Sequence, residues 1–317
     1  MESASHISVS VVLCTYNRAS SLARTLESLV IQSLPEGTDW EIVVVDNNSK
    51  DMTHQVVEDF ESRFQGRFRY LREERQGISF ARNAGIREAR GKIVAFIDDD
   101  ETAAEGWLEN LTANLHSDEW VGAGGRVVPQ WNSRRPRWML GESSFLAGPI
   151  AMFEPTVDEV DLIEPPFGAN MAFKRSVFER FGAFRTDLGR VGNGMLSGED
   201  TEFGRRLLTA GLRLRFEPNA ITLHPVEPSR LRRQYFLKWW FNKGRTDVIE
   251  HGGQTDRLRF WGIPIRVIWD VAVEAARWCV SFNPSARFIC RLKIWTYAGQ
   301  VAEHHHLAST ARRRASR

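Results

Sequence analysis

Short apolar runs alternate with helix-like segments through residues 1–100, and this alternation restricts the fold more than any other feature of the chain. The runs are Ile7–Leu13, which is rich in β-branched residues, Trp40–Val45, the short Phe68–Leu71, and Ile93–Ile97. The segments between them predict helices over Leu22–Val30, Thr53–Phe64 and Ser79–Ala89. Continuously apolar strands in a β-α-β-α order are typical of a parallel sheet with helices on both faces. The sequence therefore predicts an α/β fold.

Polar side chains follow three of the four apolar runs. They are Thr15, Tyr16 and Asn17 after the first run, Asp46 after the second, and Asp98, Asp99 and Asp100 after the fourth. In parallel α/β sheets, ligands bind outside the carboxyl ends of the strands. We therefore expect these three segments to meet at one edge of the sheet.

Asp98, Asp99 and Asp100 form a cluster of carboxylates at the end of an apolar strand. Two carboxylates two residues apart can bind one divalent cation, and Mg²⁺ or Mn²⁺ typically combines one or two carboxylates with substrate phosphates. A cation would also offset the repulsion among three adjacent carboxylates. The alternative is a solvated acidic turn. The position of the cluster at the expected ligand edge favours the cation.

Asp46 and His224 each allow a structural and a functional interpretation. Asp46 either forms a turn through side-chain hydrogen bonds to the backbone or accepts a hydrogen bond from a base or ribose. His224 follows a predicted strand and precedes Pro225, and it is a structural residue, a metal ligand or a phosphate contact. The residues alone leave these alternatives open.

Glu199 and Asp200 begin a predicted helix over Glu199–Ala210, directly after the glycine-rich segment Gly189–Gly198. Acidic residues at a helix N-terminus are explained by the helix macrodipole alone. In the catalytic interpretation, one carboxylate takes a proton from an acceptor hydroxyl. Apolar surroundings and the neighbouring carboxylate would raise its pKa toward the working range.

Cysteine usage and motifs exclude several classes of protein. The 3 cysteines, Cys14, Cys279 and Cys290, have no metal-type spacing, which excludes a cysteine-based zinc site and indicates a reducing compartment. We expect no signal peptide and no membrane-spanning helix, because a basic n-region, an A-x-A site and a run of about 18 uncharged apolar residues are all absent. The chain has no G-x-x-x-x-G-K-[ST], G-x-G-x-x-G or G-x-S-x-G motif.

Residues 122–224 mix strand and helix signals with loops rich in proline. The pattern predicts a helix over Phe173–Phe184 and two short strands over Leu212–Phe216 and Ala220–Leu223. Arg134–Ile163 shows no periodicity and is predicted to be a mobile loop region. Gly91, just beyond the helix that ends at Ala89, is expected as its C′ residue.

The segment Ser229–Arg317 is predicted to be helical, and it is basic and aromatic. It contains 17 Lys and Arg residues, 6 Asp and Glu residues, and six of the 11 tryptophans. The charged residues between Pro264 and Val280 are Arg266, Asp270, Glu274 and Arg277. Their spacing places them in one narrow stripe on an otherwise apolar helix. These helices either pack as ordinary core or lie at an anionic membrane surface with Trp at headgroup depth, and the two can coexist. No nucleic-acid partner is expected.

Taken in order along the chain, the motifs resemble those of the family-2 glycosyltransferases, which are inverting sugar-nucleotide enzymes of the GT-A fold. The resemblance extends from Ile7 to Gly244. Its elements are Cys14–Arg18, VVVDNNSKD, Gly77–Gly85 with Ala89–Gly91, FIDDDE, Gly168–Ala172, Phe181–Phe184, Gly198–Glu202 with Arg205 and Arg206, Glu217–Ala220, and His224. Each motif is short, but the ordered set is specific.

The resemblance implies roles for individual residues. Those implied for the nucleotide sugar are Thr15, Tyr16, Asn17, Asp46, Arg82, Asp98 and Asp99. Those implied for Mg²⁺ or Mn²⁺ are Asp100, Asp98 and His224, with Asp99 making the assignment ambiguous by one position. Asp200 is implied as the general base, Glu199 as the residue that positions the acceptor or the base, and Asn170 as part of the acceptor side.

The implied architecture is a GT-A domain, Rossmann-like with a mostly parallel central sheet and flanking helices, plus a C-terminal helical extension. We expect the catalytic domain over residues 1–228, with a nucleotide-sugar half at 1–125 and an acceptor half at 126–228, and the extension over 229–317. The implied activity is metal-dependent, inverting transfer of a sugar from a UDP- or GDP-sugar to a hydroxyl. The acceptor would be a saccharide, a lipid-linked molecule or another hydroxyl compound in cell-surface polysaccharide or glycolipid biosynthesis. The expected location is the cytoplasm, peripheral on the inner face of the cytoplasmic membrane if the extension binds lipid.

Two other functions would use similar residues. A nucleotidyltransferase-like enzyme also needs carboxylates and a metal, but it normally has a glycine-rich, basic phosphate loop after the first strand. Thr15–Ser20 occupies that position here and contains no glycine. A non-catalytic sugar-nucleotide binding protein is disfavoured by the presence of Asp100 and Asp200.

Overall fold

The computed structural model describes residues 7–64, 66–139, 144–155, 160–252 and 258–315. The chain divides into two compact units. The first comprises residues 1–130, 151–192 and 199–225, and the second comprises 131–150, 193–198 and 226–317.

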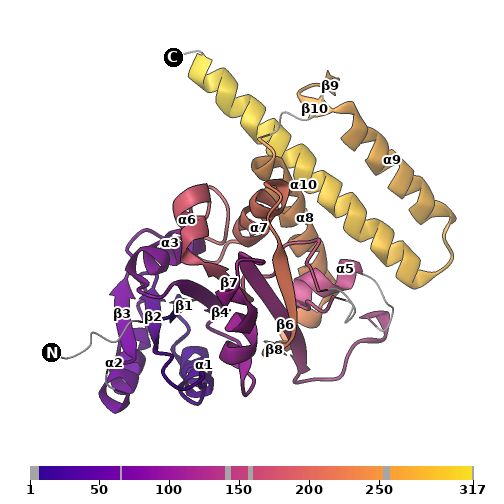
Figure 1. Cartoon of the computed structure of the whole chain (residues 1–317). Coiled ribbons are helices and arrows are strands. Elements are labelled where there is room, and N and C mark those ends of the chain that lie inside the picture. Colours follow the sequence, from indigo (N-terminus) through magenta and orange to yellow (C-terminus); the bar gives the residue numbers. More distant parts are fainter. Residues whose placement is uncertain (1–6, 65, 140–143, 156–159, 253–257, 316–317) are drawn as a thin grey trace. The chain divides into compact units, whose positions relative to one another are not determined.

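An eight-stranded sheet in the order β3-β2-β1-β4-β7-β6-β8-β5 forms the centre of the first unit (Figure 1). The strands are β1 (Val9–Thr15), β2 (Trp40–Asp46), β3 (Phe68–Arg72), β4 (Ile93–Asp98), β5 (Thr102–Ala103), β6 (Gly122–Trp131), β7 (Asn170–Lys174) and β8 (Leu214–Val226). The pairs β1–β2, β1–β4 and β2–β3 are parallel. Strand β7 pairs antiparallel with β4 and β6, and β5 pairs antiparallel with β8. The predicted α/β fold is confirmed.

Helices cover both faces of this sheet. They are α1 (Ala19–Val30), α2 (Thr53–Arg63), α3 (Ile78–Glu88), α4 (Trp107–Thr112), η1 (Ala113–His116), α6 (Arg175–Phe181) and α7 (Glu199–Thr209). Alternate residues of β1 belong to different cores: Val11 packs in the core of α1, α2 and α4, whereas Val12 packs in that of α3, α6 and α7. Because both faces of the strands are buried, their sequences are continuously apolar.

Three local predictions are wrong. The residues of Phe173–Phe184 divide between β7, which ends at Lys174, and α6, because a short apolar run looks alike in a buried strand and a buried helix. The two short strands predicted over Leu212–Phe216 and Ala220–Leu223 are one strand, β8. Gly91 has no positive φ, so it is not a C′ residue. A Cβ there would lie 2.5 Å from the backbone nitrogen of Ser10, so the glycine permits close approach to β1.

The second unit is helical, as predicted for the C-terminal segment. Its elements are η2 (Arg137–Met139), α5 (Ser144–Ala147), η3 (Gly148–Ile150), η4 (Pro228–Leu231), α8 (Arg233–Glu250), β9 (Arg259–Phe260), β10 (Ile263–Pro264), α9 (Ile265–Val280) and α10 (Pro284–Ala315). Helices α8 and α10 approach closely at Gly244, where a Cβ would lie 1.9 Å from the carbonyl oxygen of Thr296. None of the helices within the described ranges is long and apolar enough to cross a membrane.

The segment Arg134–Ile163, predicted as a loop region, contains the short elements η2, α5 and η3. Its residues 140–143 and 156–159 lie outside the described residues. An isolated bridge joins Val127 to Phe153 within the first unit.

Candidate active site

The carboxyl ends of β1, β2 and β4 meet at one edge of the sheet. The strand register pairs Thr15 with Asp46, and Cys14 with Asp98. Parallel pairing of three neighbouring strands brings these ends together, as the sequence predicts. The candidate site is built on this edge.

The loops after β1 and β2 bind each other. Asn17 has a φ of 52°, a left-handed conformation that asparagine tolerates better than most residues. Its backbone N–H donates to the Ser49 Oγ (2.9 Å), and its side-chain Oδ1 accepts from the Lys50 N–H (2.8 Å). The Asn17 side chain thus fixes this loop. Tyr16 beside it is half-buried.

Asp46 is buried, and its side chain forms the turn that was one of the two interpretations of this residue. Its Oδ1 accepts the backbone N–H of Ser49 (2.8 Å), and its Oδ2 accepts the hydroxyl of Tyr70 (2.7 Å). Burial and the hydrogen bond to Asp46 raise the pKa of Tyr70 to about 12. A contact between Asp46 and a nucleoside stays a prediction.

Arg82 joins two carboxylates from distant parts of the chain. It is buried, and its guanidinium donates to the Oε1 of Glu199 (2.5 Å) and to the Oδ1 of Asp98 (3.1 Å). Burial disfavours its charge, but Glu199 and Asp98 outweigh this and raise the pKa of Arg82. A Cβ at Gly168 would lie 2.4 Å from the Arg82 Nη2, so only glycine fits there. The two ion pairs of Arg82 connect the end of β4 to the start of α7.

Glu199 and Asp200 have different surroundings, although they are adjacent. Glu199 is buried, and burial raises its pKa to about 7, with Asp200 adding to the effect and Arg82 opposing it. Its Oε2 has no hydrogen-bond partner among the described residues. Asp200 is only half-buried, and it accepts the backbone N–H of Gly168 at Oδ2 and that of Thr201 at Oδ1, both at 2.7 Å.

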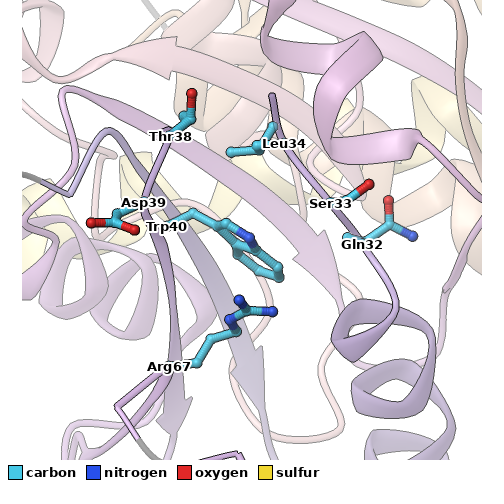
Figure 2. Close-up of a pocket in the computed structure, with 7 residues that line it drawn as sticks. All are labelled: Gln32, Ser33, Leu34, Thr38, Asp39, Trp40 and Arg67. Atoms are coloured by element: carbon cyan, nitrogen blue, oxygen red, sulfur yellow. The ribbon is translucent and has the colours of Figure 1, made fainter. Parts of the chain in front are cut away.

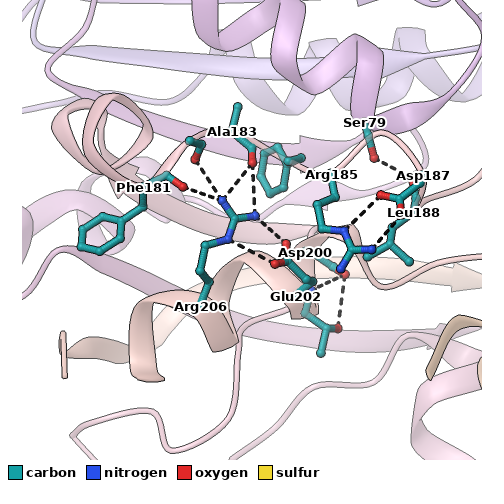
Figure 3. A network of polar contacts seen from close by, with 12 residues as sticks. Ser79, Phe181, Ala183, Arg185, Asp187, Leu188, Asp200, Glu202 and Arg206 are labelled. Carbon is teal, nitrogen blue, oxygen red and sulfur yellow. Dashed lines mark hydrogen bonds and ion pairs between the residues drawn. The ribbon is translucent and has the colours of Figure 1, made fainter. Parts of the chain in front are cut away.

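Arg206 of α7 forms hydrogen bonds to the segment that follows α6 (Figure 3). Arg206 donates to the carbonyl oxygens of Phe181 (2.7 Å) and Ala183 (3.2 Å), and it pairs with Glu202 (2.5 Å). Ser79 of α3 donates to the carbonyl oxygen of Leu188 (2.8 Å). These contacts hold the first turn of α7, and hence Asp200, in a fixed backbone frame.

Arg18 binds the carboxylate cluster, and the sequence reasoning gave it no role. Its Nη1 donates to Asp99 (2.9 Å) and Asp100 (2.7 Å). Burial raises the pKa of Asp99 to about 7, against the opposing charge of Arg18. The signal was in the sequence: Arg18 follows Asn17 in the loop that leaves β1, next to the end of β4.

Asp100, Glu101 and His224 could together hold a metal ion, because one ligand atom from each lies within 4.8 Å of the others. The register of β5 with β8 explains this group, since Thr102 pairs with Leu223 and so brings Glu101 beside His224. Glu101 and His224 are buried. The sequence reasoning predicted Asp100 and His224 but missed Glu101, the residue directly after the three aspartates.

Asp98 is not a member of that group of three. Its carboxylate pairs instead with Arg82, and its side chain is 40% exposed. A metal contact of Asp98 therefore stays a prediction, whereas the chemistry of Asp100, Glu101 and His224 fits a divalent cation. Carboxylates suit both Mg²⁺ and Mn²⁺, and an imidazole ligand favours Mn²⁺ over Mg²⁺.

Asn170 is fully buried in β7, away from any open surface. Its Oδ1 accepts from the Trp107 Nε1 (2.9 Å), and its Nδ2 donates to the carbonyl oxygens of Arg126 (2.9 Å) and Ala220 (2.8 Å). Both amide hydrogens are therefore used inside the sheet. These contacts give Asn170 a structural role, and the acceptor contact expected from the sequence stays a prediction.

A pocket of ≈ 310 Å³ lies at the opposite end of the sheet from these residues (Figure 2). Its lining includes Trp40, the first residue of β2, and Arg67, whose guanidinium lies over the Trp40 ring at 4.7 Å. Because Asp46 is at the other end of β2, this pocket is separate from the candidate site.

Comparison with known sequences agrees with this geometry. Residues 10–182, more than half of the chain, match the family model described as glycosyl transferase family 2. A glucosyl-dolichyl phosphate glucuronosyltransferase of Haloferax volcanii is 34% identical over 189 residues, which are 58% of each protein. The succinoglycan biosynthesis protein ExoM of Rhizobium meliloti is 28% identical over 287 residues, 90% of this chain and 85% of ExoM.

Solved structures share the fold. The mannosyltransferase PcManGT from Pyrobaculum calidifontis, in complex with GDP-Man and Mn²⁺, has a TM-score of 0.61 at 20% identity and covers 93% of this chain and 86% of its own. GalNAc-T7 with UDP, GalNAc and Mn²⁺ has a TM-score of 0.56 at 18% identity and covers 78% of this chain and 52% of its own. The predicted GT-A fold, with helices flanking the central sheet, is thereby confirmed.

Proposed function

The chain belongs to glycosyl transferase family 2, and on that premise we propose that it transfers a sugar from a nucleoside-diphosphate sugar to a hydroxyl acceptor with inversion at the anomeric carbon. One observation carries the proposal. An unbroken series of contacts runs from Asp98 at the end of β4 through Arg82 to Glu199, the neighbour of Asp200. Arg82 therefore links the strand end where the donor would bind to the helix start that carries Asp200, the proposed general base.

The donor would bind at the edge formed by β1, β2 and β4. Thr15, Asp46 and the neighbouring loops would contact the nucleoside, and Arg82 would lie near the sugar or diphosphate. GDP-Man and UDP in the two similar structures support a UDP- or GDP-linked donor. Asp98 and Asp99 belong to the same edge, so they are included in the proposed donor site.

Asp100, Glu101 and His224 would hold the divalent cation. A bound Mn²⁺ or Mg²⁺ would neutralise the diphosphate charge and so stabilise the departing nucleoside diphosphate. Two similar structures with Mn²⁺ support the assignment. Arg18, which pairs with Asp99 and Asp100, adds a further positive charge at the place where the diphosphate would lie.

Asp200 would act as the general base. Its half-buried carboxylate is oriented by the N–H groups of Gly168 and Thr201 and by the Thr201 hydroxyl, which donates to Oδ1 (3.3 Å), and Oδ2 keeps a second lone pair for a substrate proton. The acceptor hydroxyl would lose its proton to Asp200 as its oxygen bonds to the anomeric carbon. The bond from that carbon to the diphosphate oxygen would break, and the electron pair would leave with the nucleoside diphosphate. Glu199 would position this step by fixing Arg82.

The names of two relatives support a proposal for the acceptor class. One is named for succinoglycan biosynthesis and another for transfer to a glucosyl-dolichyl phosphate, so we propose a saccharide or lipid-linked acceptor. A catalytic domain at residues 1–228, with donor and acceptor halves, would complete the arrangement.

Calorimetry with UDP and GDP tests the proposed cation and donor sites. Binding should require Mn²⁺ or Mg²⁺ and should fall at least about tenfold in Asp100→Asn and in His224→Gln, because each change removes one cation ligand. Asp118→Asn, at an exposed aspartate, is the matched control. Binding that is unchanged by EDTA and by both site variants would contradict the cation assignment.

A further inference from the structure

Helix α9 buries Glu274 of its charged stripe together with Val267, and it turns an apolar face outward. Glu274 is buried against α10, where it accepts from Lys293 of α10 (3.2 Å) and from Arg277 (2.7 Å). The exposed face opposite this stripe is formed by Ile265, Ile268, Trp269, Ala272, Ala276 and Val280. Their spacing of three and four residues makes one continuous stripe along the helix. A helix of a globular protein usually turns its apolar stripe toward the core, so an exposed apolar stripe along α9 is unusual.

The apolar surface continues beyond both ends of α9. Trp261, just before the helix, is 82% exposed, and Phe282, just after it, is 98% exposed. Trp269 in the middle is 69% exposed. Exposed apolar surface of this extent marks an interaction site on a folded protein. We call Trp261, the six apolar residues of α9 and Phe282 together the α9 face.

Positive charge surrounds the α9 face. Arg259, Arg266 and Arg277 are exposed beside it. Residues 258–310 contain six Arg and Lys residues but three Asp and Glu residues. A second copy of the chain would therefore bring two like-charged surfaces together. An anionic lipid leaflet offers phosphates for the guanidinium groups and hydrocarbon for the apolar side chains.

We propose that the α9 face docks on an anionic lipid bilayer, with α9 lying parallel to the membrane surface. Exposed tryptophans and flanking arginines on one helix face are typical of helices that lie in the interfacial layer. At about 1.5 Å per residue, α9 is long enough to hold several side chains at that depth. The inference concerns where the enzyme works and does not depend on the proposed chemistry.

Co-sedimentation of the full chain with vesicles tests the proposal. Vesicles of phosphatidylcholine with phosphatidylglycerol should bind the protein, and vesicles of phosphatidylcholine alone should bind it more weakly. Trp269→Glu should reduce binding to the anionic vesicles about tenfold or more. Ile31→Glu is the matched control, because Ile31 is 66% exposed in the first unit and the change adds the same charge.

Salt separates the two contributions to binding. At about 1 M NaCl the electrostatic part should be screened, while the part due to Trp269 should persist. Equal loss of binding in Trp269→Glu and Ile31→Glu would overturn the proposal, as would absence of binding to anionic vesicles. So would sedimentation velocity without lipid that shows a dimer of the wild type but a monomer of Trp269→Glu, because the face would then belong to a second copy.

Discussion

At the scale of single residues, the two carboxylates at the start of α7 differ in burial and in partners. Glu199 is buried against Arg82, whereas Asp200 is half-buried and held by backbone N–H groups. A carboxylate that already neutralises an arginine is poorly placed to accept a substrate proton. This difference is why we assign the base to Asp200 and the positioning role to Glu199.

Asp200→Asn should abolish transfer without weakening donor binding. The amide cannot accept the acceptor proton, so we expect the rate of transfer to fall about 10²–10⁴-fold. Calorimetric binding of UDP or GDP should stay at the wild-type value. The conservative variant Asp118→Asn, at an exposed position, should keep full activity. Transfer by Asp200→Asn at close to the wild-type rate would remove Asp200 from this role.

Glu199 should make the stability of the protein depend on pH. Its pKa is raised from 4.5 to about 7 by burial, so between these values the folded state binds more protons than the unfolded state. The contribution of Glu199 to the free energy of unfolding should therefore be most favourable below pH 4.5 and decrease through pH 7, by about 1.4 kcal/mol per unit of pKa difference.

Urea unfolding from pH 4 to pH 8 measures this effect. Glu199→Gln should remove that part of the pH dependence, whatever its effect on absolute stability. Glu27→Gln, at an exposed residue of α1, should leave the dependence unchanged. If Glu199→Gln and wild type keep the same pH profile, the pKa of Glu199 is not raised.

Site residues that lie at the ends of strands could be predicted from the sequence. A site residue whose position depends on the pairing of distant strands could not. Thr15, Asp46 and Asp98 follow apolar runs, so their convergence could be derived from the pattern alone. Glu101 could not, because its position beside His224 comes from the pairing of β5 with β8. That pairing joins segments far apart in the chain, and the periodicity of the sequence does not predict which distant strands pair.

At the scale of elements, the neighbours of β7 determine what its polar residue Asn170 does. Asn170 opens β7, and its register partner is Ile97 of β4. The amide joins α4, β6 and β8 through Trp107, Arg126 and Ala220. The motif that suggested an acceptor contact therefore maintains the sheet.

Asn170→Ala should destabilise the first unit by about 2–4 kcal/mol, because three hydrogen bonds and a filled buried volume are lost. Urea unfolding checks the magnitude. Asn110→Ala is the control, because that amide donates to the carbonyl oxygen of Gly106 in its own helical turn. An unchanged stability combined with a raised KM for the acceptor would instead restore the acceptor role.

Short elements were the least predictable part of the fold. Phe173 lies in β7 and not in a helix, and the two strands predicted near Leu214 are one. The first error arises because a short apolar run has no period long enough to distinguish strand from helix, and the second because Pro218 and Asn219 between the two runs are residues typical of turns. The longer alternation of residues 1–100 left no such ambiguity.

At the scale of the whole molecule, the sequence predicted an α/β catalytic region followed by a basic helical region. The structure has two compact units, and the second includes residues 131–150 and 193–198 as well as the C-terminal helices. The sequence of those two short segments contains no pattern that predicts their packing with α8. Trp240, for example, donates to the carbonyl oxygen of Phe145 (2.9 Å).

The most direct test of the account is proton NMR of the reaction in real time. The full chain is mixed with Mg²⁺, which is diamagnetic, a UDP- or GDP-sugar and a saccharide or polyprenyl-phosphate-sugar acceptor. The account predicts that an α-linked donor is consumed, that one nucleoside diphosphate is released per sugar, and that the new linkage has β configuration. A product that retains the α configuration, or the absence of turnover and of binding for every UDP- and GDP-sugar tested, would contradict it.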